Sequence, residues 1–123
     1  MAGERFTLVW SGQVAVVAVA GEVDITNAEG LRDALLSALN AGAAGLVADM
    51  TQVTFLDSAG VTALVRAARR ATATDATLRL AVTVPAVLRV LSLVGIDRLI
   101  PVYPSLADAM ASLPDQSGRG LPA

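Results

Sequence analysis

The sequence contains no cysteine, no histidine and no lysine, so every basic side chain is an arginine. Without cysteine the chain has neither a disulfide framework nor a thiolate nucleophile. Without histidine it lacks the commonest general base at neutral pH, and both absences together remove the ligands of nearly all structural zinc sites. Because only carboxylates and hydroxyls remain for chemistry, a protein that acts by binding is favoured over an enzyme, with no metal or cofactor expected.

Long apolar runs are also missing, although 54% of the residues are hydrophobic. The longest run, Val14–Ala20, is far shorter than the ~18 residues that a membrane-spanning helix needs, and it is typical of one buried strand. The first five residues show neither the basic start nor the apolar core of a signal peptide. Together with the absence of cysteine, this predicts a cytoplasmic protein that does not insert into a membrane.

Clustered positive charge is likewise absent, because nine arginines are outnumbered by eleven acidic residues and the net charge is -2. Nucleic-acid binders need basic clusters that displace counterions from phosphates, so this balance argues against them. A length of 123 residues suits one domain with a sizeable core. We predict a single domain over 1–113, followed by a disordered tail over 114–123 that is rich in proline and glycine.

Hydrophobic periodicity predicts alternating strands and helices. An opening hairpin is predicted over Phe6–Trp10 and Val14–Ala20, and later strands over Leu46–Met50, Leu78–Val82 and Leu99–Tyr103. One helix is predicted from Asp24 or Thr26 to Leu39, with Ile25 on its apolar face. A second is predicted after Ser58, and its residues point inward at Val61, Leu64, Val65 and Ala68 and outward at Arg66, Arg69 and Arg70. Two more are predicted over Pro85–Val94 and Ser105–Leu113. Because alternating strands and helices require crossovers, we expect an α/β fold: a small, mostly parallel sheet of four to five strands with an N-terminal antiparallel hairpin, packed against about four helices.

Two polar turns carry the candidate functional residues. Asp24 follows the second strand, Asp57 is the last residue of the segment 51–57, which we expect to be a loop, and Ser58 comes directly after it. Serine is favoured where helices start, so Ser58 has a purely structural explanation as a helix cap. It also suits a phosphorylation acceptor, because the amides and dipole of a helix N-terminus stabilise a phosphate. That phosphate would add nearly two negative charges beside Asp57 and repel an acidic or closely packed partner.

Three segments in this order and spacing resemble the STAS domains of bacterial anti-sigma factor antagonists: Gly21–Asp24, Val53–Gly60, and Pro85–Leu91 with Gly95 downstream. The resemblance extends over Phe6–Leu113 and implies the STAS fold, a small mixed sheet covered by helices. It also implies that the chain binds an anti-sigma factor that is a serine kinase, releasing a sigma factor, and that this kinase switches the chain off by phosphorylating Ser58. A phosphatase that acts on phosphorylated Ser58 is expected as a further partner.

Carried over to this chain, the resemblance implies partner-binding roles for Asp24, Asp57, Ser58, Ala59, Gly60 and Val61. Gly60 would let the backbone of a partner approach closely. Ala59 is a departure, since the family often has a second serine or threonine there. We expect Phe55 and Leu56 to lie in the core, and the free protein to be a monomer or a weak dimer.

The alternative is a STAS domain without a phosphorylation switch, serving as a scaffold in a signalling complex or as a soluble subunit of a lipid or anion transport system. The pair Asp57 and Ser58 favours the switch. An enzyme is disfavoured because no third group would activate the serine as a nucleophile. Nucleotide binding is disfavoured because the chain has no glycine-rich phosphate loop with lysine.

Overall fold

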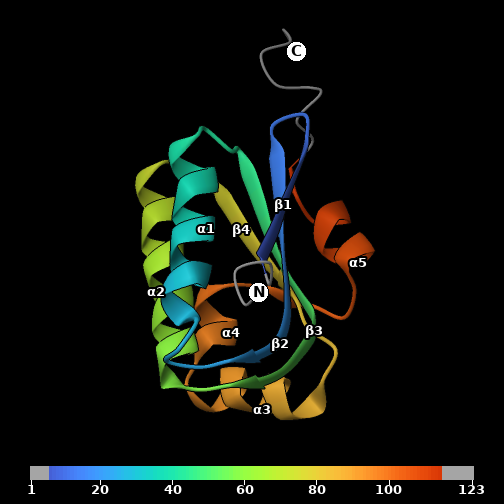
Figure 1. The fold of residues 1–123 in the computed structure, drawn as a ribbon. Coiled ribbons are helices and arrows are strands. Elements are labelled where there is room, and N and C mark those ends of the chain that lie inside the picture. The colour runs from blue at the N-terminus through green and yellow to red at the C-terminus, as the bar shows by residue number, and fades with distance from the viewer. Residues whose placement is uncertain (1–5, 115–123) are drawn as a thin grey trace, which may run out of the picture.

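The computed structural model describes residues 6–114, which form a twisted sheet covered by helices (Figure 1). The strands are β1 (Phe6–Ser11), β2 (Val14–Val23), β3 (Gly45–Leu56), β4 (Thr77–Ala81) and β5 (Val102–Tyr103). The helices are α1 (Ala28–Asn40), α2 (Ser58–Ala73), α3 (Pro85–Leu93), α4 (Ile96–Leu99) and α5 (Leu106–Ala111). The strands lie in the order β1-β2-β3-β4-β5, with β1 antiparallel to β2 and the other pairs parallel. The predicted α/β fold and its antiparallel hairpin are therefore confirmed.

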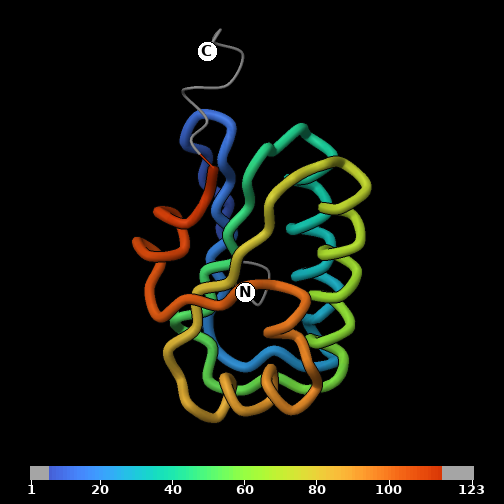
Figure 2. The backbone as a smooth tube through the Cα atoms, turned by 180° about the vertical axis from the view of Figure 1, so that it is seen from behind, coloured from blue at the N-terminus to red at the C-terminus, as the bar shows by residue number. Residues whose placement is uncertain are grey.

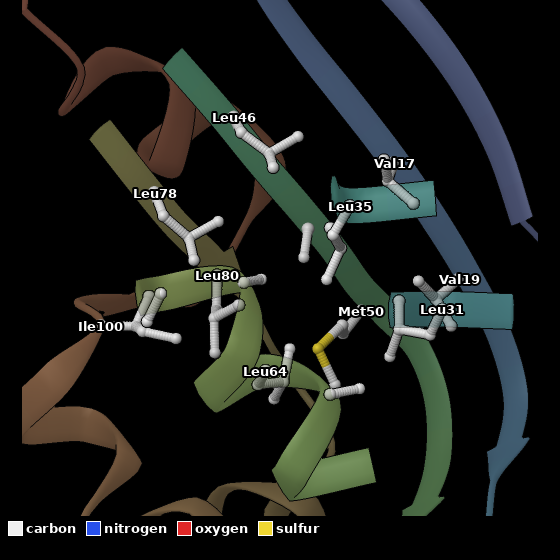
Figure 3. Packing of buried hydrophobic residues seen from close by; sticks show 14 of the residues in the cluster. Val17, Val19, Leu31, Leu35, Leu46, Met50, Leu64, Leu78, Leu80 and Ile100 are labelled. Carbon is white, nitrogen blue, oxygen red and sulfur yellow. The ribbon is translucent and has the colours of Figure 1, made fainter. Parts of the chain in front are cut away.

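The helices cover the two faces of the sheet unequally. α1 and α2 lie side by side on one face and α5 lies on the other, as both views show (Figures 1 and 2). The main core fills the space beneath α1 and α2, where aliphatic side chains of both helices meet those of β2, β3 and β4 (Figure 3). Leu91 of α3, Ile96 of α4 and Ile100, directly after α4, also belong to this core. A smaller cluster of Val47, Ala81 and Ala109 lies under α5.

The segment 51–57, which we predicted to be a loop, is mostly strand. β3 continues to Leu56 because it stays paired with the long strand β2, up to the partners Val23 and Leu56. Val53 and Leu56 of this segment are buried. Two long parallel strands therefore end together, and this common edge carries both candidate turns.

The start of α1 also differs from the prediction. The helix begins at Ala28 with Asn27 as its N-cap residue, and not at Asp24 or Thr26. The Asp24 carboxylate accepts a hydrogen bond from the Thr26 amide at 2.9 Å, and this bond stabilises a non-helical turn. Ile25 is consequently 81% exposed instead of lying on the buried helix face.

The chain after α3 contains a helix that the sequence did not predict. Gly95 has a φ of 81°, a conformation that glycine adopts without steric cost, and it separates α3 from the single turn α4. The predicted strand Leu99–Tyr103 shortens to β5, and with α4, residues 6–114 hold five helices instead of four.

Beyond Pro114, the predicted tail lies outside the described residues. Within the described part of the chain, no helix is long and apolar enough to cross a lipid bilayer.

Candidate functional site

Asp57 connects the end of β3 to the start of α2 and caps the helix. Its carboxylate oxygen Oδ1 accepts hydrogen bonds from the amides of Ala59 at 2.9 Å and Gly60 at 3.2 Å. Its own amide donates to the Val23 carbonyl oxygen at 3.2 Å, which attaches the cap to the end of β2. Asp57 therefore satisfies two amides that the first turn of a helix leaves without partners, and it has a structural role whether or not it contacts a partner.

Ser58 is the first residue of α2, and its side chain is exposed. Within residues 6–114 its hydroxyl makes no hydrogen bond, while its carbonyl oxygen accepts one from the Thr62 hydroxyl at 2.9 Å. Asp57, and not Ser58, is thus the N-cap of α2. A phosphate on Ser58 would not find the amides of Ala59 and Gly60 free, because Asp57 already occupies them. It would remain on the surface beside the Asp57 carboxylate.

Gly60 is buried, and its small size serves the internal packing of the domain. A Cβ atom added there would lie 2.9 Å from Val23 Cγ1 and closer still to Leu56 Cδ1. Both of those side chains are almost fully buried, so they have little room to move away. The expectation that Gly60 gives access to a partner's backbone is therefore wrong, because core side chains fill that space. Ala59 and Val61, on either side of it, are half-buried.

Asp24 lies next to Asp57 because the two residues follow neighbouring parallel strands. Val23 pairs with Leu56 at the last position of the two strands, and each aspartate comes one residue later. Asn27 holds the loop after Asp24 in place. Its side chain accepts from the Asp24 amide at 3.0 Å and donates to the Glu22 carbonyl oxygen at 2.8 Å. The structure therefore brings Asp24, Asp57 and Ser58 to one edge of the sheet, as the predicted topology required.

Two exposed apolar side chains at this edge were not expected there. Phe55 is 49% exposed and Ile25 is 81% exposed, whereas Leu56 is buried as predicted. The register of β2 and β3 shifts between Gly21 and Glu22, so that Thr54 is an extra residue in β3. Such a bulge reverses the alternation of faces and turns Phe55 outward. Alternation alone, with Val53 buried, indicated the opposite for Phe55, and the sequence carried no clear signal of the bulge.

Asp24, Ile25, Phe55, Asp57 and Ser58 all lie within two residues of the ends of β2 and β3, and we refer to them as the serine surface. It combines carboxylates, two large apolar side chains and one exposed hydroxyl, which is a combination that suits recognition by another protein. Among the described residues, no group of three or more carboxylates is placed to hold a metal ion. The surface offers an exposed hydroxyl in an acidic and apolar setting.

The comparison with protein families agrees with this geometry. The model of the STAS domain matches residues 6–109, which is most of the chain and includes every residue of the serine surface. The chain belongs to the STAS domain family. The strand order and the helix after β3 are thus those of a STAS domain, and the fold resemblance inferred from sequence is confirmed.

Solved structures place this STAS domain beside several relatives. It is similar to an anti-sigma factor antagonist from Mycobacterium paratuberculosis, with 29% identity, a TM-score of 0.82, and 89% of this chain and 93% of that chain covered. The phosphorylated form of the Bacillus cell fate determinant SpoIIAA shares the fold at 19% identity and a TM-score of 0.67. The alignment covers 86% of this chain and 96% of that chain. A sulfate transporter family protein from Wolinella succinogenes also shares the fold, with 18% identity and a TM-score of 0.73. The alignment covers 84% of this chain and 86% of that chain. No curated protein sequence matches the chain.

Proposed function

We propose that this STAS domain is an anti-sigma factor antagonist that is switched off by phosphorylation of Ser58. In this proposal it binds an anti-sigma factor that is also a serine kinase and thereby releases a sigma factor. The observation that carries the proposal is the exposed Ser58 hydroxyl, which makes no hydrogen bond within the described chain and lies at the edge that also holds Asp24 and Asp57. The similarity to the Mycobacterium paratuberculosis antagonist supports the same role.

The geometry explains how one phosphate would release the partner without unfolding the domain. Because the Ser58 hydroxyl makes no hydrogen bond within residues 6–114, its modification breaks none there. A phosphoserine carries about two negative charges, and here they would add to the carboxylates of Asp57 and Asp24. A partner packed on Phe55 and Ile25 would face that charge in a desolvated interface, where like charges cost several kcal/mol.

The partner-binding residues would then divide into two kinds. Asp24, Phe55 and Ile25 would contact the kinase directly, since they are exposed or half-buried on the serine surface. Asp57, Gly60 and the half-buried Ala59 and Val61 would fix the position of the first turn of α2. A phosphatase that removes the phosphate from Ser58 would restore binding.

The test is a pull-down from a lysate of the native host with added ADP and magnesium. Wild-type protein and Ser58→Ala are expected to retain a kinase-fold anti-sigma factor, and Ser58→Asp is expected to bind at least about tenfold more weakly, a loss of ~1.4 kcal/mol. Ser92→Asp is the matched control, because Ser92 is an exposed helical serine on α3, which contributes no residue to the serine surface. Incubation of the captured kinase with ATP should add phosphate to the wild-type protein and not to Ser58→Ala.

Equal binding by Ser58→Ala and Ser58→Asp would contradict the switch. Recovery of transporter or scaffold subunits by every bait would instead support the second candidate function, a STAS domain without a switch. The fold shared with the Wolinella succinogenes protein of the sulfate transporter family is the observation behind that candidate. Ser58 would then be an ordinary first residue of α2.

A further inference from the structure

A trough runs along α2 from the serine surface toward the other end of the helix. It consists of two neighbouring hollows, of 290 Å³ and 610 Å³, which have Thr62 and Arg66 in common as lining residues. The smaller hollow reaches Ile25 and Ala59, beside Ser58. α1 forms the other wall, and the two helices lie side by side in both views (Figures 1 and 2). We call this feature the arginine trough.

The charge of the trough is opposite to that of the whole chain. Four arginines line it, namely Arg32, Arg66, Arg69 and Arg70, against a single acid, Glu29, in a protein whose net charge is -2. Arg32 is already paired with Glu29 and Asp33. The positive charge that remains comes from α2, on the outward face that the sequence predicted.

Two of these arginines have no partner in the described chain. Arg70 donates a hydrogen bond to the Asn40 side chain at 2.8 Å, but Arg66 and Arg69 make neither a hydrogen bond nor an ion pair with residues 6–114. Both are exposed and three residues apart, so they lie on the same side of α2. Their charge is available to an acidic group from outside the domain.

The floor of the trough is apolar. Leu36 of α1 and Val61 and Val65 of α2 line the larger hollow and are half-buried. A small anion would use the arginines and gain nothing from the aliphatic floor. A segment that presents carboxylates along one side and aliphatic side chains along the other would use both.

We infer that the arginine trough binds an acidic, amphipathic segment of a partner protein, with its carboxylates on Arg66 and Arg69 and its aliphatic side chains on Val61, Val65 and Leu36. Under the proposed function, on which this assignment of the partner rests, the segment belongs to the anti-sigma factor kinase. Arg66 lies eight residues after Ser58, which is about 12 Å along a helix axis. One partner is therefore able to cover both surfaces. It would meet acidic side chains on the serine surface and basic side chains in the arginine trough.

The first experiment compares two double variants as baits in the pull-down. Arg66→Glu combined with Arg69→Glu is expected to lower retention of the kinase by about tenfold or more, because like charges replace complementary ones. Arg89→Glu combined with Arg98→Glu makes the same charge change at exposed arginines of α3 and α4, and it is expected to retain the kinase. Circular dichroism of both variants verifies that the surface substitutions leave the fold intact. Equal retention by the two double variants would overturn the inference.

A second experiment tests the trough without the kinase, so that its failure is distinguishable from failure of the switch. The probe is a synthetic helical peptide with glutamate on one face and leucine on the other. Its binding is measured by changes in the backbone amide NMR shifts of the domain. We expect shifts over residues 61–70, and affinity at least about tenfold lower for the Arg66→Glu, Arg69→Glu variant. A peptide with lysine in place of glutamate should not bind.

Two results of the peptide experiment would overturn the inference. One is the absence of saturable binding, or equal binding by the two double variants. The other is amide shifts with inorganic phosphate alone that match those with the peptide, which would assign the trough to a small anion. Loss of peptide binding in the variant, combined with equal kinase capture by Ser58→Ala and Ser58→Asp, would retain the trough and reject the switch.

Discussion

α1 and α2 begin at the same edge of the sheet in different ways. Each follows a long parallel strand, and each has a glycine as its third residue, Gly30 in α1 and Gly60 in α2. The first turn of α2 is capped by the Asp57 carboxylate and packed tightly on the core. The first turn of α1 has no side-chain cap, and its N-cap residue Asn27 bonds backward to the preceding loop.

This difference places the exposed serine on the more rigid of the two helix starts. The Asp57 amide is bonded to the end of β2, and Gly60 lies against buried side chains, so the first turn of α2 is fixed from both sides. Local stability of this kind follows buried contacts and hydrogen bonds. A modification of Ser58 would then alter the charge of a fixed surface.

The largest effect on stability is expected for Gly60→Ala. The new Cβ would clash with Leu56 and Val23, and we expect a net destabilisation of about 2 kcal/mol, within the usual range for overpacking a core. Urea denaturation measures it as a lower midpoint with an unchanged slope. A stability equal to that of the wild type would show that the first turn of α2 moves away from the sheet more easily than the packing indicates.

The sequence predicted what depends on periodicity and chain order. Alternating strands and helices implied parallel neighbours, and parallel neighbours that end together bring Asp24 and Asp57 to one edge. The helix after Ser58 and its outward arginines also followed from spacing alone. Most elements that position the site were therefore predictable from local patterns, but the second half of β3, which leads to Asp57, was predicted to be a loop.

The details of the site depended on contacts that no local pattern encodes. Phe55 is exposed because a register shift between β2 and β3 changes its face, and that shift arises from pairing between segments about 30 residues apart. The N-cap of α1 is Asn27 because Asp24 is held in a turn by Thr26. The burial of Gly60 likewise depends on Leu56 and Val23 meeting in space.

A smaller effect is expected when the cap of α2 is removed. Asp57→Ala leaves the amides of Ala59 and Gly60 without their acceptor and should cost about 1 kcal/mol of unfolding free energy. Asp57→Asn is the matched control, since asparagine caps about as well while removing the charge. If the asparagine variant lost as much stability as the alanine variant, the charge of Asp57, and not its hydrogen bonds, would be what stabilises this turn.

The smallest effect is expected for Gly30→Ala, the counterpart of Gly60→Ala in α1. The added Cβ would lie 2.7 Å from the Phe6 ring, but Phe6 is only half-buried at the start of the edge strand β1 and has room to shift. Alanine also favours a helix over glycine by about 1 kcal/mol, which offsets that shift. We therefore expect the unfolding free energy to stay within about 0.5 kcal/mol of the wild type. A loss as large as that of Gly60→Ala would mean that the first turn of α1 is held as firmly as that of α2, and the contrast between the two helix starts would not stand.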